Sequence, residues 1–113
     1  MDLNTTHLTD NELVEKFISG NQQAIDTLIR RHRKRVFGYI LLLVKNHTTA
    51  EDVFQDTFVK VIHSLQQGKY IENGRFVSWV MRIAHNLIID HFRREKQLNT
   101  ISNESTPVDI FNS

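Results

Sequence analysis

Helix-breaking residues are scarce in this chain, and their scarcity limits what it can fold into. The sequence has only four glycines and one proline in 113 residues, and Pro107 lies near its end. The long segments between these residues carry apolar side chains at every third or fourth position, which is the spacing of an amphipathic helix. The sequence therefore predicts an all-α fold, a compact bundle of about four helices.

The first two helices are predicted from their start and stop signals. Residues 10–19 form a short helix, because Thr9 and Glu12 have the spacing of a capping box and Gly20 follows the last apolar position. A second, longer helix begins near Asn21, which is a favourable N-cap residue. Its apolar positions continue at helical spacing through most of the next two dozen residues.

The second helix is expected to end at residues 46–47, and two more helices follow it. The third is predicted over residues 49–67, where Thr48 and Glu51 form a second capping-box pair. The fourth is predicted over residues 75–96, after a loop with the sequence QQGKYIENG. Both helices have one continuous apolar stripe, so both are expected to pack against the same core.

One folded domain, residues 9–97, is expected between two polar ends. We interpret residues 1–8 as a flexible tail and residues 98–113 as a linker or disordered tail. Hydrophobic residues make up 40% of the chain, which is enough for a core, and a net charge of +1 indicates no partner by itself. The absence of cysteine excludes disulfides and suits a cytoplasmic location, and the longest apolar run, residues 40–44, is too short for membrane insertion.

The fourth helix places the one tryptophan of the chain, Trp79, on a mostly basic face. At roughly 100° per residue, the apolar positions cover a wide arc and the arginines cover the opposite arc. The expected buried arc consists of Phe76, Val77, Val80, Met81, Ile83, Ala84, Leu87, Ile88 and Phe92. The polar arc consists of Arg75, Trp79, Arg82, Asn86, Asp90 and Arg93, with Lys96 near its edge.

Two interpretations of this polar arc stay open from the residues alone. Arginines that neutralise phosphates, an indole ring for stacking and an amide for a base edge together suit unstacked nucleic-acid bases. Alternatively, Trp79 covers the neighbouring loop and the arginines are solvated. The segment RRHRKR, residues 30–35, leaves a similar choice between DNA or polymerase contact and a solvated face, since its charges point in several directions.

The third helix has a polar face beside its apolar stripe. As a general acid–base pair, Asp52 and Asp56 would require a pocket and a substrate group nearby, whereas a docking surface requires neither, so no enzymatic activity is predicted. None of the six histidines falls in a metal-ligand motif, so neither a metal site nor a cofactor is predicted. The polar face, an arc about 100° wide, consists of Asp52, Gln55, Asp56, Val59 and His63.

Three segments of the chain, taken in order, resemble the second conserved region of bacterial sigma factors of the extracytoplasmic-function group. They are ELVEKFISGNQQAIDTLIRRHRKRVF, AEDVFQDTFVKVIHSL and, after a short loop, FVSWVMRIAHNLIIDHFRRE. The resemblance covers about residues 10–96. It implies a protein that binds core RNA polymerase, directs it to promoters and helps to open the −10 element, with an anti-sigma factor as a further candidate partner.

The resemblance also implies roles for individual residues. In this family the third helix docks on the clamp coiled coil of the largest polymerase subunit, and the loop before the fourth helix holds a base flipped from the non-template strand. The implied polymerase-binding residues are Asp52, Gln55, Asp56 and Val59. The implied DNA-binding residues are Lys69, Tyr70 and Asn73 in the loop, Arg75, Trp79, Arg82 and Asn86 on the helix, and Arg93 and Arg94 at its basic end.

One departure from this family's pattern concerns the number of domains. These sigma factors normally carry a second helical domain that reads the −35 element, and we expect this chain to be one domain of a longer protein rather than an incomplete homologue. A competing hypothesis from another functional class is a helical protein-interaction module that docks on polymerase without recognising promoter DNA. Such a module would not require the polar arc of the fourth helix or the loop before it.

Overall fold

The computed structural model describes residues 7–70 and 74–102, and side chains up to Leu98. The described residues form helices and their connections, without a strand. This arrangement confirms the predicted all-α fold. The helices of this described part of the chain are α2 (Asp10–Ile18), α3 (Gln22–Val44), α4 (His47–Gln66) and α5 (Phe76–Ser102).

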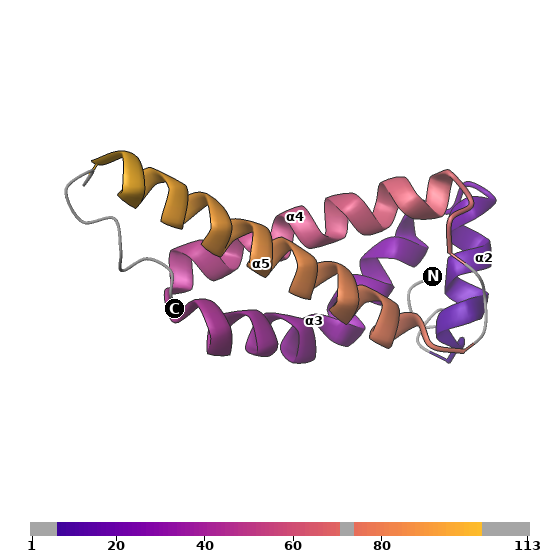
Figure 1. Ribbon diagram of the computed structural model, residues 1–113. Coiled ribbons are helices and arrows are strands. Elements are labelled where there is room, and N and C mark those ends of the chain that lie inside the picture. The colour runs from indigo at the N-terminus through magenta and orange to yellow at the C-terminus, as the bar shows by residue number, and fades with distance from the viewer. Residues whose placement is uncertain (1–6, 71–73, 103–113) are drawn as a thin grey trace.

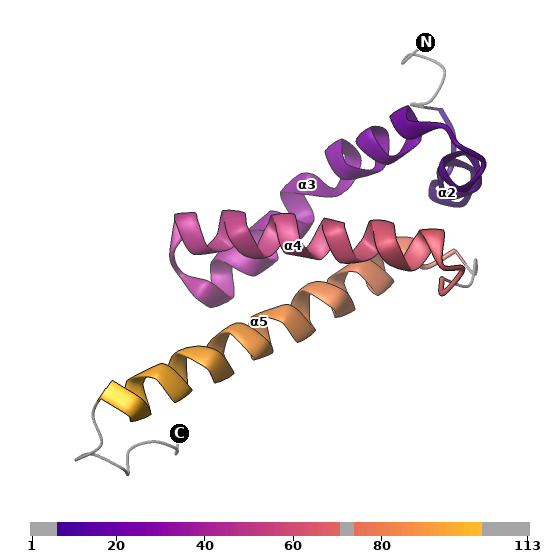
Figure 2. The same ribbon diagram turned by 90° about the horizontal axis from the view of Figure 1, so that it is seen from above.

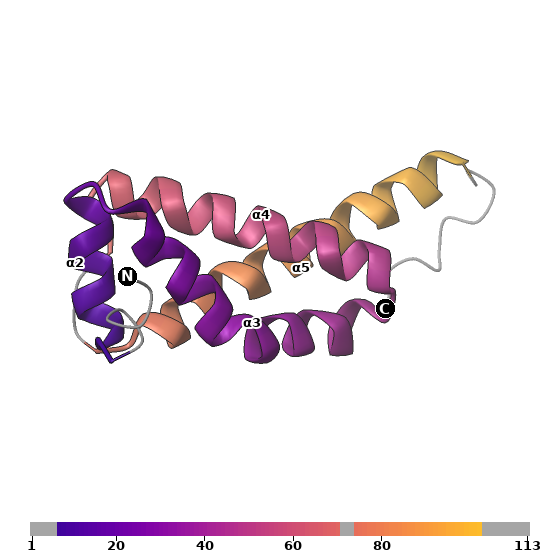
Figure 3. The same cartoon turned by 180° about the vertical axis from the view of Figure 1, so that it is seen from behind.

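Three long helices pack along one another, and the short α2 lies across one end of them. Figures 1 and 2 show α2 beside the start of α3, the end of α4 and the start of α5. In Figure 2, α2 is viewed along its own axis while the long helices run across the view. Figure 3 shows a bend in the middle of α3, so that its first half approaches α2 and its second half runs beside α4. The connection between α4 and α5 therefore lies at the same end of the molecule as α2.

The core forms where the apolar stripes of all four helices meet. Its largest fully buried side chains include Leu13 from α2, Leu28 from α3, Leu65 from α4 and Phe76 from α5. Burying one such side chain contributes about 1.5–3 kcal/mol, so the four stripes together hold the helices in place. The buried hydroxyl of Thr57 donates a hydrogen bond of 2.7 Å to the Val53 carbonyl, so it brings no unsatisfied polar atom into the core.

The predicted start of the chain's first helix is confirmed in atomic detail. The backbone N–H of Glu12 donates to Thr9 Oγ1 at 3.1 Å, and the Thr9 N–H donates to Glu12 Oε1 at 2.8 Å, which completes the capping box. Gly20 follows the helix with a φ of 113°, a backbone conformation that favours glycine. Local sequence signals therefore suffice to define α2.

The predicted boundary between the second and third helices is wrong. Helix α3 ends at Val44, and Lys45 takes a left-handed conformation with a φ of 57° as its C-cap. This turn makes Asn46 the N-cap of α4, with Oδ1 accepting from the Thr49 N–H at 2.8 Å. The helix consequently begins at His47, earlier than the Thr48–Glu51 pair predicts, because an Asn cap precedes that pair.

The fourth predicted helix extends further than expected. Helix α5 continues to Ser102, whereas residues 98–102 were predicted to belong to a linker or disordered tail and the helix to end at Lys96. No proline or glycine interrupts this segment, so its polar composition alone does not end the helix. Phe92, predicted to be buried, is 42% exposed, because α5 leaves α3 and α4 towards its C-terminal end (Figure 1).

Candidate functional site

The predicted docking face lies on the outer side of α4. All four of its residues are exposed, and Val59 is an exposed apolar side chain with 48% of its surface accessible. The opposite side of the helix is buried at Val53, Phe58 and Val61. The prediction that these four side chains lie away from the core is therefore confirmed. They are Asp52, Gln55, Asp56 and Val59.

A groove between α3 and α4 runs along this face, with a volume of about 380 Å³. Aromatic and aliphatic side chains line it together with charged ones, so it combines an apolar floor with polar walls. Its α3 wall, which the sequence did not indicate, becomes evident only when the two helices are side by side. Three of the four docking residues, Asp52, Gln55 and Val59, line this groove. Its full lining consists of Ile29, Arg33, Glu51, Asp52, Phe54, Gln55, Phe58, Val59 and Ile62.

Arg33 forms the positive part of this groove. Its guanidinium carbon lies 4.9 Å from the centre of the Phe54 ring and 5.5 Å from that of Phe37, within the range of a cation–π contact. One of its nitrogens is also 3.8 Å from Glu51 Oε2. Arg33 is thus held in a defined position over the apolar floor, with the carboxylates of Glu51 and Asp52 on the α4 side.

The basic segment RRHRKR does not form one continuous patch. Arg31 turns towards α2, where its NH1 is 2.9 Å from Asp10 Oδ1, while Arg33 turns towards α4. Arg30, Lys34 and Arg35 are exposed. Two of the arginines therefore connect helices of this chain, and the remaining charges spread around α3.

The predicted DNA-binding residues lie along the start and outer side of α5 and in the connection before it. Lys69, Arg75, Arg82 and Asn86 are exposed, and Tyr70 and Trp79 are partly buried. Arg93 and Arg94 are exposed near the C-terminal end, with Arg93 3.4 Å from Asp90. Asn73 lies outside the described residues.

Trp79 belongs to an aromatic cluster at the start of α5. Its ring centre is 4.6 Å from that of Tyr70 and 6.0 Å from that of Phe76, and the rings of Tyr70 and Phe76 meet edge to face at 5.8 Å. Trp79 therefore packs against Tyr70 of the preceding connection, as the alternative interpretation of the polar arc proposed. Its neighbours along the arc, Arg82 and Asn86, are exposed.

Helix α2 reaches this cluster through a residue that the sequence did not single out. The hydroxyl of Tyr70 donates a partly buried hydrogen bond of 3.3 Å to Asn11 Oδ1 in the first turn of α2. The two residues are far apart in the sequence, so no local pattern could have paired them. This contact connects α2 to the candidate strand-binding residues.

Several of the histidines contact other side chains of the chain. The Tyr39 hydroxyl lies 2.8 Å from His85 Nδ1, which joins α3 to α5, and His91 lies 3.5 Å from Glu95 on the same helix. The described residues contain no group of three or more His, Asp or Glu side chains placed to hold a metal ion. None of the described helices is long and apolar enough to span a membrane.

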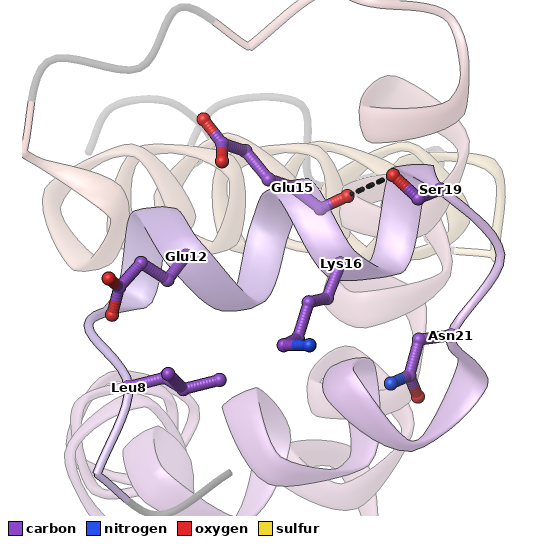
Figure 4. Close-up of a pocket in the computed structure, with 6 residues that line it drawn as sticks. All are labelled: Leu8, Glu12, Glu15, Lys16, Ser19 and Asn21. Atoms are coloured by element: carbon purple, nitrogen blue, oxygen red, sulfur yellow. Dashed lines mark hydrogen bonds between the residues drawn. The ribbon is translucent and has the colours of Figure 1, made fainter.

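A second hollow lies between α2 and the start of α3, and Figure 4 shows its side chains. It has a volume of about 460 Å³ and contains none of the predicted site residues. Glu12 is used in the helix cap, and the Ser19 hydroxyl donates to the Glu15 carbonyl at 2.9 Å, as the dashed line in Figure 4 marks. The lining consists of Leu8, Glu12, Glu15, Lys16, Ser19 and Asn21.

Comparison with known proteins gives one family and several relatives. The family model described as Sigma-70 region 2 matches residues 28–97. RNA polymerase sigma factor CarQ of Myxococcus xanthus is 38% identical over 86 residues, which is 76% of this chain and 48% of that protein. The ECF RNA polymerase sigma factor BldN of Streptomyces coelicolor is 34% identical over 86 residues, 75% of this chain and 32% of that protein.

A third relative, the RNA polymerase sigma-H factor of Pseudomonas aeruginosa, is 31% identical over 86 residues, covering 76% of this chain and 44% of that protein. The chain thus spans less than half the length of these three relatives. No solved structure matches the chain.

Proposed function

This chain belongs to the Sigma-70 region 2 family, and on that premise we propose that it binds core RNA polymerase and recognises and opens the promoter −10 element. The family is one of sigma factors and not of enzymes. The action we propose is therefore binding without a chemical step: one surface holds the polymerase and another captures the non-template strand. The protein would act in the cytoplasm, where core polymerase is found, and an anti-sigma factor would be a further partner.

The exposed face of α4 is the surface that we assign to core polymerase. Val59 offers an exposed apolar centre, and Asp52 and Asp56 surround it with negative charge. An apolar centre with a charged rim is typical of protein interfaces, and the charges steer the partner and fix its register. We propose that the clamp coiled coil of the largest polymerase subunit packs its basic, amphipathic side along this face and the adjoining groove.

The outer side of α5 and the connection before it are the surface that we assign to the non-template strand. Arg75, just before α5, and Arg82 on α5 are exposed and would contact backbone phosphates, and the Asn86 amide can both donate to and accept from a base edge. Flipping a base costs a few kcal/mol of unstacking, and these contacts together with Lys69 and Tyr70 would offset that cost. Arg93 and Arg94 would contact phosphates further along the strand.

The polymerase-binding surface is tested by reversing one charge. We expect Asp56→Arg to abolish recovery of core polymerase in a pull-down, because it places a cation against a basic partner. Asp26→Arg, an exposed acidic position on α3, is the matched control and should bind like the wild type. Wild-type recovery by Asp56→Arg, with unchanged helicity, would place the docking surface elsewhere.

The strand-binding surface is tested by removing the Asn86 amide. Asn86→Ala should weaken binding of a −10 single strand by roughly 10-fold or more, since one bidentate base contact is worth about 1–3 kcal/mol. Fluorescence anisotropy over a salt series measures this, and the steep salt dependence of phosphate binding should be retained. Gln22→Ala, exposed on α3, is the control. Equal strand affinity for all three proteins would count against promoter recognition through α5.

A docking module without DNA recognition is the second candidate, and the position of Trp79 favours it. The Trp79 ring packs 4.6 Å from Tyr70, so part of its stacking surface is already occupied within the protein. If the module only docks, the wild type should bind a −10 strand no more tightly than a strand of scrambled sequence. Trp79→Ala and Asn86→Ala should then leave that affinity unchanged. Sequence-dependent binding that either variant weakens would exclude this candidate.

A further inference from the structure

The aromatic cluster at the start of α5 is linked to α2 through Tyr70 and through α3, and α2 precedes the family match at residues 28–97. Two adjacent residues in the first turn of α2 provide these links. Asn11 accepts the 3.3 Å hydrogen bond from the Tyr70 hydroxyl. Its neighbour Asp10 reaches the same aromatic cluster by a second route, through α3.

That second route begins at the Asp10 carboxylate. Both of its oxygens lie 3.0 Å from Nε2 of His32, and one of them is 2.9 Å from NH1 of Arg31. The His32 ring in turn packs against Phe76, the first residue of α5, with ring centres 5.9 Å apart. A fixed carboxylate therefore orients the imidazole that supports the buried Phe76 ring.

The two routes converge on Trp79. Tyr70 and Phe76 are its two ring neighbours, at 4.6 and 6.0 Å, and each is held by one residue of the α2 first turn, directly or through His32. Ordering a residue costs backbone entropy, and a binding surface that is already ordered avoids that cost when its ligand arrives. Tyr70 and Phe76 are thus positioned by a helix that does not itself carry any predicted strand-binding residue.

We infer that the first turn of α2 is a positioning element of the strand-binding surface, in which Asn11 acts through Tyr70 and Asp10 acts through His32 and Phe76 to fix Trp79. The inference rests on the proposed function of the α5 surface. Asn11 and Asp10 are positioning residues that need not touch the strand. At 3.3 Å the hydrogen bond between Tyr70 and Asn11 is long. The ring contacts therefore provide much of the packing, and the hydrogen bond to Asn11 fixes the position of the Tyr70 hydroxyl.

The test uses the full chain and its single tryptophan. Asn11→Ala and Tyr70→Phe each remove the hydrogen bond, while alanine favours the helix and phenylalanine keeps the ring, so neither variant should prevent folding. Acrylamide quenching of Trp79 without DNA reports the cluster, and anisotropy reports affinity for a −10 single strand. Lys16→Ala, exposed on α2, is the matched control, and Asp10→Asn tests the second route.

We expect both variants to increase quenching and to weaken strand binding by about 2- to 10-fold, the range for one hydrogen bond. The double variant should be no weaker than either single variant, because both remove the same bond. Asp10→Asn should act in the same direction, and Lys16→Ala should match the wild type. If the Tyr70 hydroxyl instead contacts the strand directly, Tyr70→Phe should weaken strand binding and Asn11→Ala should leave it unchanged. That result would overturn the inference.

The remaining outcomes are also decisive. Unchanged quenching in Asn11→Ala and Tyr70→Phe would overturn the inference, because the cluster would then not depend on α2. Changed quenching with unchanged strand affinity would overturn it as well, since Trp79 would move without consequence for the strand. A wild-type chain that binds no −10 strand would overturn the proposed function itself, and the quenching result, which needs no DNA, distinguishes this failure from a missing contact between α2 and Tyr70.

Discussion

At the scale of single residues, backbone conformation explains what the side-chain pattern missed. The sequence places the α3–α4 boundary at residues 46–47, but Lys45 already leaves the helix with a φ of 57°. A left-handed residue other than glycine costs about 1–2 kcal/mol, and lysine gives no sequence signal for that conformation. The N-cap of α4 is therefore Asn46 instead of Thr48, which only the three-dimensional structure shows.

This strain gives a stability prediction. Lys45→Gly should raise the free energy of unfolding by up to about 1 kcal/mol, because glycine adopts positive φ without a steric cost and loses only part of that gain to entropy. Lys60→Gly, exposed within α4, should lower it by about 1 kcal/mol. Urea denaturation followed by circular dichroism measures both, and a loss of stability in Lys45→Gly would mean that the Lys45 conformation carries no strain.

At the scale of elements, the two halves of α5 have different surroundings. Its first half contributes Val80, Ala84 and Ile88 to the core, as the apolar arc of the sequence predicts. Its second half leaves the bundle, which exposes Phe92 and Leu98 and carries the helix to Ser102. Periodicity identifies which side of a helix is apolar, but it does not show how far neighbouring helices extend to cover it.

Two adjacent isoleucines test this division of α5. Ile88 is 1% exposed and Ile89 is 40% exposed. Ile88→Ala should cost about 2–4 kcal/mol of unfolding free energy, from lost burial and the cavity it leaves, whereas Ile89→Ala should cost less than about 1 kcal/mol. Chemical denaturation of the two variants under the same conditions provides the comparison. Equal losses would show that something covers the outer side of α5.

At the scale of the whole molecule, the proposed polymerase-binding and strand-binding surfaces lie apart, and helix α2 is connected to the strand-binding surface. The proposed polymerase-binding face lies on α4 with the groove wall from α3, and the proposed strand-binding residues lie on α5 and in the connection before it. Because core side chains separate these surfaces, the effects of Asp56→Arg and Asn86→Ala should be independent of one another. Helix α2 is different, since Asn11 and Asp10 act on the α5 surface from the end of the bundle.

The sequence by itself determined the helical class, the four apolar stripes, the capping box of α2 and the exposed position of the four α4 residues. These features depend on the spacing of side chains along one helix, which a single sequence contains. Only the tertiary structure decided that Arg33 and Ile29 complete the groove, that Trp79 packs on Tyr70, and that Asn11 holds Tyr70. Those contacts join residues far apart in the chain, and the packing of the helices, rather than any local preference, brings them together.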